Sequence, residues 1–328
     1  MRQVIRFALV AVLATAPVAR AAEVDPLLPA ETEAVARVNV KQMLQSDLMK
    51  KFAIPKLKDA MKAGDAAAAL EKLGLDPLKD IDSATMGIWG TDSQDMKVVG
   101  ILHGTFDKDK LMKAAEEFAK ATPDKMSIVE EGDFKMIKFT GDEGKPGYAA
   151  VADAKTVVIG SDKKIVANSL TAKKSGAKAK LSKELTALVL KQDEKASMFI
   201  CGMTDGKFNN LPANIDGIPG INGEQLKQQL GKMTNAVMTV RLGKDVTLEI
   251  TAGMKDADAA DGFGGNIGAL IDLAKNFIPI AAGNAPPQFQ PLIADVTKTL
   301  KHSIKKTDVT LSLKLSADAL SKLSADEK

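Results

Sequence analysis

The sequence predicts an α+β protein of two related halves, in which antiparallel or mixed sheets are covered by helices. Short alternating or β-branched segments are bounded by turn residues, and stretches of helical periodicity lie between them. Segments of the second half also repeat the order of segments in the first. Because helices and strands alternate in some regions and cluster in others, these patterns favour α+β over a doubly wound parallel sheet.

The first half begins with a strand that ends near Val40, followed by the helical stretches KQMLQSDLMKKF and DAAAALEKLG. Two strands are expected at 82–90 and 97–106, joined by the polar turn TDSQDM, and a helix is expected to open near Asp107. The rest of this half comprises four short β segments and a lysine-rich helix: MSIVEE, FKMIKF, GYAAVA, TVVIG and KKIVANSLTAKKSGAKAK.

The second half predicts an internal duplication. ASMFICGM stands where AVARVNV stood, TNAVMTVRLG answers DSATMGIWG, VTLEITAGM answers VVGILHGTF, and DVTLSLKLSADAL answers TVVIGSDKKIV. We therefore expect a first repeat at 22–180, which carries an extra β-meander, and a second at 181–328, which carries long helices around 258–304.

The first residues have the pattern of a secretory signal peptide. Arg2 and Arg6 precede an apolar stretch at 7–16, and small residues Ala19 and Ala21, on either side of Arg20, come just before an expected cleavage point after residue 21. No other apolar run approaches the roughly 18 residues that a membrane helix needs. We therefore expect an exported protein, periplasmic or extracellular, with no transmembrane segment after signal removal. It is not expected to be lipid-anchored, because no cysteine stands at the cleavage point.

Charge and aromatic content argue against nucleic acid as a partner. The chain has 45 Lys+Arg and 42 Asp+Glu, and the leader removes three arginines, so the mature charge is expected to be 42 minus 42, or zero. Only Arg37 and Arg241 remain as arginines, and aromatic residues make up 4% of the chain. Recognition of bases and single strands favours arginine forks and aromatic platforms, which this sequence lacks.

Three segments give the chain a family resemblance: LLPAETEAVARVNV, LEKLGLDPLKDIDS and GTFDKDKLMKAAEEFAK. They resemble a family of exported bacterial proteins of unknown function with a similar proline-alanine-acid opening. The resemblance covers most of residues 27–170 and implies export and an α+β fold. It implies no catalytic or binding residues.

Side chains that carry catalytic chemistry are few. The imidazoles are His103 and His302, the single thiol is Cys201, and no G-x-S-x-G motif occurs. We expect no metal and no cofactor, and we expect Cys201 to be a small buried hydrophobe in a strand. A hydrolase would have to combine His103 with an acid or serine that the sequence does not reveal.

The stretch GFGGNIG, at 262–268, stands where a nucleotide-binding turn would be expected, but its spacing departs from G-x-G-x-x-G. Helical periodicity fits better and places these glycines inside an amphipathic helix that begins near Asp258 and that Pro279 kinks. Gly264 and Gly268 then form a strip that admits a close neighbour, either another helix or a ligand. The residues expected to pack closely or face a ligand are Phe263, Gly264, Ile267, Gly268 and Ile271.

The function predicted first is a non-catalytic binding or scaffolding module that contacts an envelope protein through one of its sheets. The alternative is a carrier of an apolar, lipid-like ligand, indicated by the apolar helix at 263–282 and the Pro/Gly/Asn loop at 210–223. A hydrolase comes third, because the sequence shows no serine or acid that would act together with His103.

Overall fold

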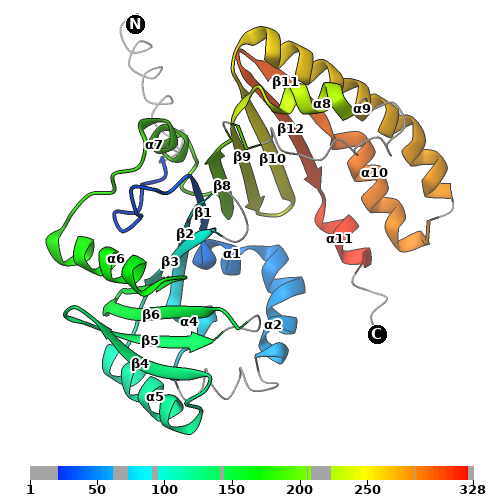
Figure 1. Ribbon diagram of the computed structural model, residues 1–328. Helices are drawn as coiled ribbons and strands as arrows, with labels where there is room; N and C mark the ends of the chain where they lie inside the picture. The colour runs from blue at the N-terminus through cyan, green and yellow to red at the C-terminus, as the bar shows by residue number, and fades with distance from the viewer. Residues whose placement is uncertain are drawn as a thin grey trace, which may run out of the picture.

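The computed structural model describes most of the chain, and residues 1–20 of the expected leader, residues 65–72 of the helical stretch DAAAALEKLG and residues 210–222 of the Pro/Gly/Asn loop lie outside the described residues. The described residues are 21–61, 73–90, 95–140, 144–204, 206–207, 223–283 and 285–323. The α+β prediction is confirmed: helices flank one large antiparallel sheet (Figure 1). Among the described helices, none is both long enough and apolar enough to cross a membrane.

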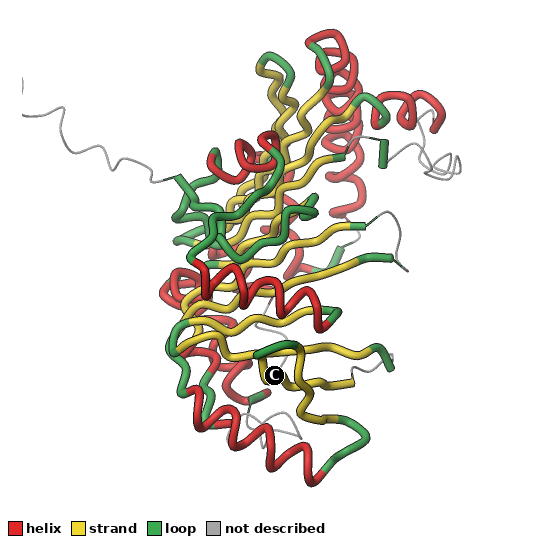
Figure 2. The backbone as a smooth tube through the Cα atoms, turned by 60° about the vertical axis from the view of Figure 1, so that its left-hand side comes forward, coloured by secondary structure: helices red, strands yellow, loops and turns green. Residues whose placement is uncertain are grey.

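The sheet has twelve strands and runs without a break through both halves (Figure 2). Its order is β11-β12-β10-β9-β8-β1-β2-β3-β7-β6-β5-β4. The strands of the first half are β1 (Ala34–Val38), β2 (Ile81–Trp89), β3 (Lys97–Gly104), β4 (Met126–Glu131), β5 (Phe134–Thr140), β6 (Pro146–Asp153) and β7 (Thr156–Gly160). Those of the second half are β8 (Met198–Met203), β9 (Met233–Leu242), β10 (Val246–Met254), β11 (Lys301–Lys305) and β12 (Asp308–Leu315).

The two halves meet at the pairing of β1 with β8, in which Ala36 lies opposite Ile200. Outward from this pair the order is β1-β2-β3-β7 on one side and β8-β9-β10-β12 on the other. The segments matched in the sequence therefore occupy equivalent places about the centre of the sheet. This arrangement is what an internal duplication predicts, and the duplication itself stays a prediction.

Side-chain caps fix several helix ends. Helix α5 (Lys108–Ala121) begins after Asp107, as predicted, and the Asp107 carboxylate accepts the Lys110 N–H at 3.0 Å. Helix α6 ends at Gly176, which adopts the left-handed conformation that favours glycine. The helices of the first half are α1 (Val40–Gln45), η1 (Met49–Ala53), α2 (Ile54–Ala60), α4 (Pro77–Asp80), α5 (Lys108–Ala121) and α6 (Lys163–Ser175). Those of the second half are α7 (Lys183–Leu190), α8 (Gly223–Leu230), α9 (Ala257–Gly283), η2 (Pro287–Phe289), α10 (Gln290–Thr299) and α11 (Ala317–Leu323).

One face of the central sheet, which we call the covered face, holds the main core. Val35, Val99, Ile101 and Cys201 are almost fully buried there. They pack with side chains of α6 and α7 and with Leu27 and Leu28 of the segment 22–32, here called the N-terminal strap.

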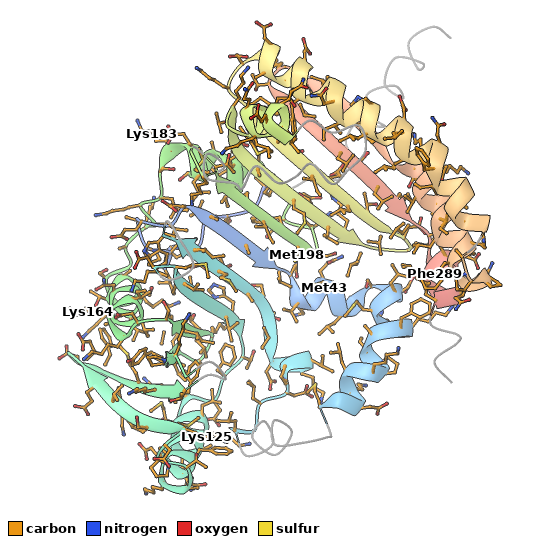
Figure 3. All side chains as sticks on the ribbon, turned by 45° about the vertical axis from the view of Figure 1, so that its right-hand side comes forward. Met43, Lys125, Lys164, Lys183, Met198 and Phe289 are labelled. Carbon is orange, nitrogen blue, oxygen red and sulfur yellow. The ribbon has the colours of Figure 1, made fainter. Side chains whose placement is uncertain are left out.

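The opposite face, which we call the open face, carries an apolar row that follows the strand register. Directly paired residues point to the same side of a sheet. The row from β7 to β12 is Ile159, Gly100, Met86, Ala36, Ile200, Met238, Ile250 and Leu311. Three of its members are more than a third exposed: Met86 at 42%, Ile200 at 37% and Ile250 at 39%. Figure 3 shows the broad sheet with α9 and α10 along one border and α1 and α2 along another.

We predict that Cys201 is chemically silent in the folded protein. Burial raises the pKa of its thiol to about 12, so at pH 8 it stays protonated. Ellman's reagent should find no thiol in the native protein and one after unfolding in guanidinium. Because the unfolded thiol ionises near its ordinary pKa, stability should fall between about pH 9 and pH 12 as the unfolded state loses this proton. Rapid labelling of the native protein at pH 8 would contradict the buried placement.

Candidate functional site

A hollow of about 390 Å³ lies on the open face, over strands β1, β2, β3 and β7. It is lined by Ala36, Val38, Ala84, Thr85, Met86, Val98, Gly100, Leu102, Ile159, Gly160 and Ser161. No charged side chain is among these lining residues. The volume falls in the range of small-molecule sites in proteins, roughly 300 to 1,000 Å³.

The hollow exists because small residues stand at its centre. Ala84 and Gly100 contribute little or no side chain, while Met86, Leu102 and Ile159 stand around them. A methyl group added at Gly100 would meet only Ile159, at an ordinary contact distance of 3.9 Å. The floor is therefore formed by Cα and Cβ atoms of a hydrogen-bonded sheet.

Polar groups at the hollow are already engaged or turned away. The Ser161 hydroxyl accepts the Val98 N–H at 3.1 Å. Thr85 is 5% exposed, and its partner Ile101 belongs to the buried cluster of the covered face. The hollow thus offers a ligand apolar contact and little else.

The open face stays apolar beyond the hollow. Ile200, Met238 and Ile250 continue the row across β8, β9 and β10. Single exposed aliphatic side chains are common on proteins, but a row at the centre of a large sheet is a continuous apolar surface.

The five residues singled out in the sequence lie elsewhere, in α9, and none of them lines the hollow. Phe263 and Ile267 belong to a second core cluster that includes Ala252 and Val309, and Ile271 is 7% exposed. The motif GFGGNIG is helical, so these glycines form no phosphate-binding turn.

Strand β11 supplies the neighbour that Gly264 and Gly268 admit. A Cβ at Gly264 would lie 2.5 Å from Ile304 Cδ1, and one at Gly268 would lie 2.7 Å from His302 Cε1. At both positions the close neighbour is a side chain of the edge strand β11. The sequence predicted either another helix or a ligand there. His302 is thus an exposed residue of β11 whose ring lies against α9 at Gly268.

His103 has an acid partner that sequence reasoning missed. Its Nε2 lies 2.6 Å from Asp25 Oδ2, and Asp25 Oδ1 accepts the Leu27 N–H at 3.1 Å. The Asp25 side chain is 5% exposed, so this pair fastens the N-terminal strap to β3.

A hydrolytic site would also need a nucleophile within hydrogen-bond reach of His103. Ser83 and Thr156 stand opposite His103 on β2 and β7. Thr156 is 1% exposed and its hydroxyl accepts from Lys173 Nζ at 3.2 Å. In the described part of the chain no hydrogen bond joins either hydroxyl to His103. Nor do the described residues bring together three or more His, Cys, Asp or Glu that could hold a metal ion.

The sequence did not reveal the hollow, because its lining residues come from four strands that are separate in the sequence. One feature of the sequence did point to it. VVGILHGTF is apolar at both odd and even positions, so both faces of β3 need apolar partners. Other residues of the chain bury the apolar side chains of the covered face, but they bury those of the open face only in part.

Comparisons with known proteins give two structural likenesses, both at very low sequence identity. No family model matches the chain, and no curated protein matches it. The solved structures of crystal forms III and I of TP0453 resemble it with TM-scores of 0.49 and 0.45 and sequence identities of 7% and 8%. Each comparison covers 92% of this chain, and 99% and 98% of the TP0453 chains respectively. The sequence resemblance to a family of exported proteins stays a prediction.

We predict that Gly264→Leu lowers the free energy of unfolding by about 2 kcal/mol, because the new side chain must displace Ile304. The matched control is Gly265→Leu, since Gly265 has open space around it, and this change should stabilise α9 by up to about 1 kcal/mol. Adding Ile304→Ala to Gly264→Leu should restore part of the loss. Urea denaturation followed by circular dichroism measures all three, and an undiminished Gly264→Leu variant would refute the close contact.

Asp25→Ala is expected to loosen the N-terminal strap. It leaves the buried Leu27 N–H without its acceptor and His103 without its partner, which should cost about 2 kcal/mol. Limited proteolysis should then cut within 22–32 faster than in the parent protein. Glu31→Ala is the control, because Glu31 is an exposed acid of the same strap. Equal cleavage rates in the two variants would show that Asp25 does not hold the strap.

Proposed function

We propose that this chain is a non-catalytic binding protein that holds an apolar, lipid-like ligand on the open face of its sheet. The observation that carries the proposal is the apolar hollow over β1, β2, β3 and β7, continued by the exposed row Met86, Ile200 and Ile250. With its hydroxyls engaged or turned away, the hollow offers a ligand almost only hydrophobic contact.

Magnitudes indicate how long such a ligand must be. About eight methylene groups in the hollow would contribute about 6 kcal/mol, at about 0.8 kcal/mol each. The loss of translational and rotational freedom costs about 4 to 15 kcal/mol, which offsets most or all of that gain. A ligand bound tightly must therefore extend beyond the hollow, over Ile200, Met238 and Ile250. An acyl chain of a lipid has this shape and chemistry.

The proposal includes export of the chain, with 1–21 as a signal peptide. The basic start, the apolar stretch and the small residues before the expected cleavage point support it. An apolar ligand has low solubility in water, so a carrier in an envelope compartment gives such a molecule a soluble form.

A protein partner docked on the open face is the second candidate. The exposed row spans strands from β2 to β10, which is wider than the hollow and favours a broad contact. The two candidates differ at Gly100, because filling the hollow removes a ligand site but leaves Ile200 and Ile250 available to a partner.

We predict that Gly100→Leu abolishes binding of a fluorescent fatty-acid analogue while the protein stays at least as stable. The space above Gly100 accepts a side chain, and leucine favours the strand over glycine. Gly265→Leu, the same exchange on the solvent side of α9, should bind like the parent protein. Native mass spectrometry of the parent should also show co-purified lipid that Gly100→Leu lacks. Unchanged affinity for the probe in folded Gly100→Leu would contradict the proposal. If Ile250→Asp lost a captured protein partner and Gly100→Leu kept it, the second candidate would be favoured.

A further inference from the structure

A second and larger hollow, of about 560 Å³, shares no lining residue with the open-face site and lies between α5, α6 and strands β5 and β6. The ladder between these strands ends at the pair Ile137 and Ala149, so the strands separate over the residues beyond. The hollow occupies this gap. Figure 1 shows α5 and α6 close to strands β4–β6 at one end of the sheet.

Four ammonium groups surround the hollow: Lys108 from α5, Lys135 from β5, and Lys173 and Lys174 from α6. The only carboxylate in its lining is Asp133. Glu116 and Asp153 pair with Lys135 and Lys173 from outside the lining, so four ammonium groups face three carboxylates, a net charge of 4 minus 3, or +1. The hollow is therefore weakly cationic, although the mature chain as a whole is expected to be neutral.

The ion pairs of these lysines are weak enough to yield to a ligand. Lys174 Nζ lies 3.7 Å from Asp133, Lys173 Nζ lies 3.1 Å from Asp153, and Lys135 Nζ lies 2.5 Å from Glu116. The Lys135 and Lys174 side chains are 51% and 71% exposed, and exposed pairs contribute at most about 1 kcal/mol. Lys108 forms no salt bridge with any described residue.

The floor of the hollow is apolar, with Met112, Phe134 and Leu170 among its residues. Lysine ammonium groups bind a phosphate as point charges, without the bidentate fork that arginine offers to phosphate and carboxylate alike. Cationic groups at the rim and an apolar floor together match an amphiphilic anion. A doubly charged head would gain more from four lysines than a singly charged one.

We propose that this basic hollow binds a phosphate monoester that carries a short apolar body. The phosphate lies among Lys108, Lys173 and Lys174, and the apolar body contacts Phe134 and Leu170. Such a group occurs both in free phosphate esters and in the headgroup region of phosphatidic acid.

Calorimetry with hexyl phosphate at 150 mM salt tests the site. We expect one saturable site, with affinity at least about tenfold above that of inorganic phosphate, because the alkyl chain adds apolar contact. Lys108→Gln and Lys174→Gln should each weaken binding about five- to tenfold, and Lys108→Arg should retain it. The control is Lys164→Gln, because Lys164 (labelled in Figure 3) is an exposed lysine on the same helix α6 and does not line the hollow.

Absence of saturable binding would overturn the proposal. An equal loss of affinity in Lys164→Gln would also overturn it, because it would indicate general attraction to positive charge. Equal affinity for hexyl phosphate and inorganic phosphate would do the same, because it would show that the apolar floor does not contribute to binding. Phosphatidic acid vesicles, compared with phosphatidylcholine vesicles, distinguish the sources: binding that hexyl phosphate displaces assigns a lipid headgroup, and soluble binding alone assigns a free ester. Gly100→Leu should bind hexyl phosphate normally, because the two hollows share no residue.

Discussion

The register between β1 and β8 is the constraint on which both faces of the sheet depend. It sets Ala36 opposite Ile200 and Val35 opposite Cys201, so it joins the two halves and assigns every side chain of the centre to a face. A slip of one residue would turn Val35 and Cys201 outward and bring the open-face row into the core. The deep burial of Val35, at 1% exposure, makes such a slip costly, so one register dominates.

The two faces differ in what the chain supplies to cover them. The covered face has α6, α7 and the N-terminal strap, which the Asp25–His103 pair fastens in place. On the open face, α9 packs over Ala252 and Val309 near one edge and leaves Met86, Ile200 and Ile250 exposed. Taking such a side chain from full exposure to full burial is worth about 1.5 to 3 kcal/mol, and about two-fifths of that is unrealised at each of these residues. A bound apolar molecule would bury the exposed part of these side chains, and this burial would stabilise the complex.

Local signals in the sequence predicted much of the fold. Alternation and turn residues located the strands, capping residues such as Asp107 located helix starts, and periodicity placed GFGGNIG inside a helix. These local signals could not predict which residues far apart in the sequence pair with one another. Asp25 and His103 are 78 positions apart. The segment KHSIK forms strand β11, although the sequence predicted long helices around 258–304. The hollow was hidden for the same reason, because Ala36, Ala84 and Gly100 meet only once β1, β2 and β3 are in register.

The construction of the open-face hollow also limits how selective it can be. Its floor belongs to a hydrogen-bonded sheet, so its shape is fixed before a ligand arrives and binding requires little reorganisation. Selective sites fix a ligand with a few well-placed polar groups, but here the Ser161 hydroxyl already accepts a backbone N–H. Apolar contact alone discriminates by only about 1 to 3 kcal/mol per methylene. A site of this kind accepts many chains of similar thickness, which suits a carrier better than an enzyme that must hold one bond in one place.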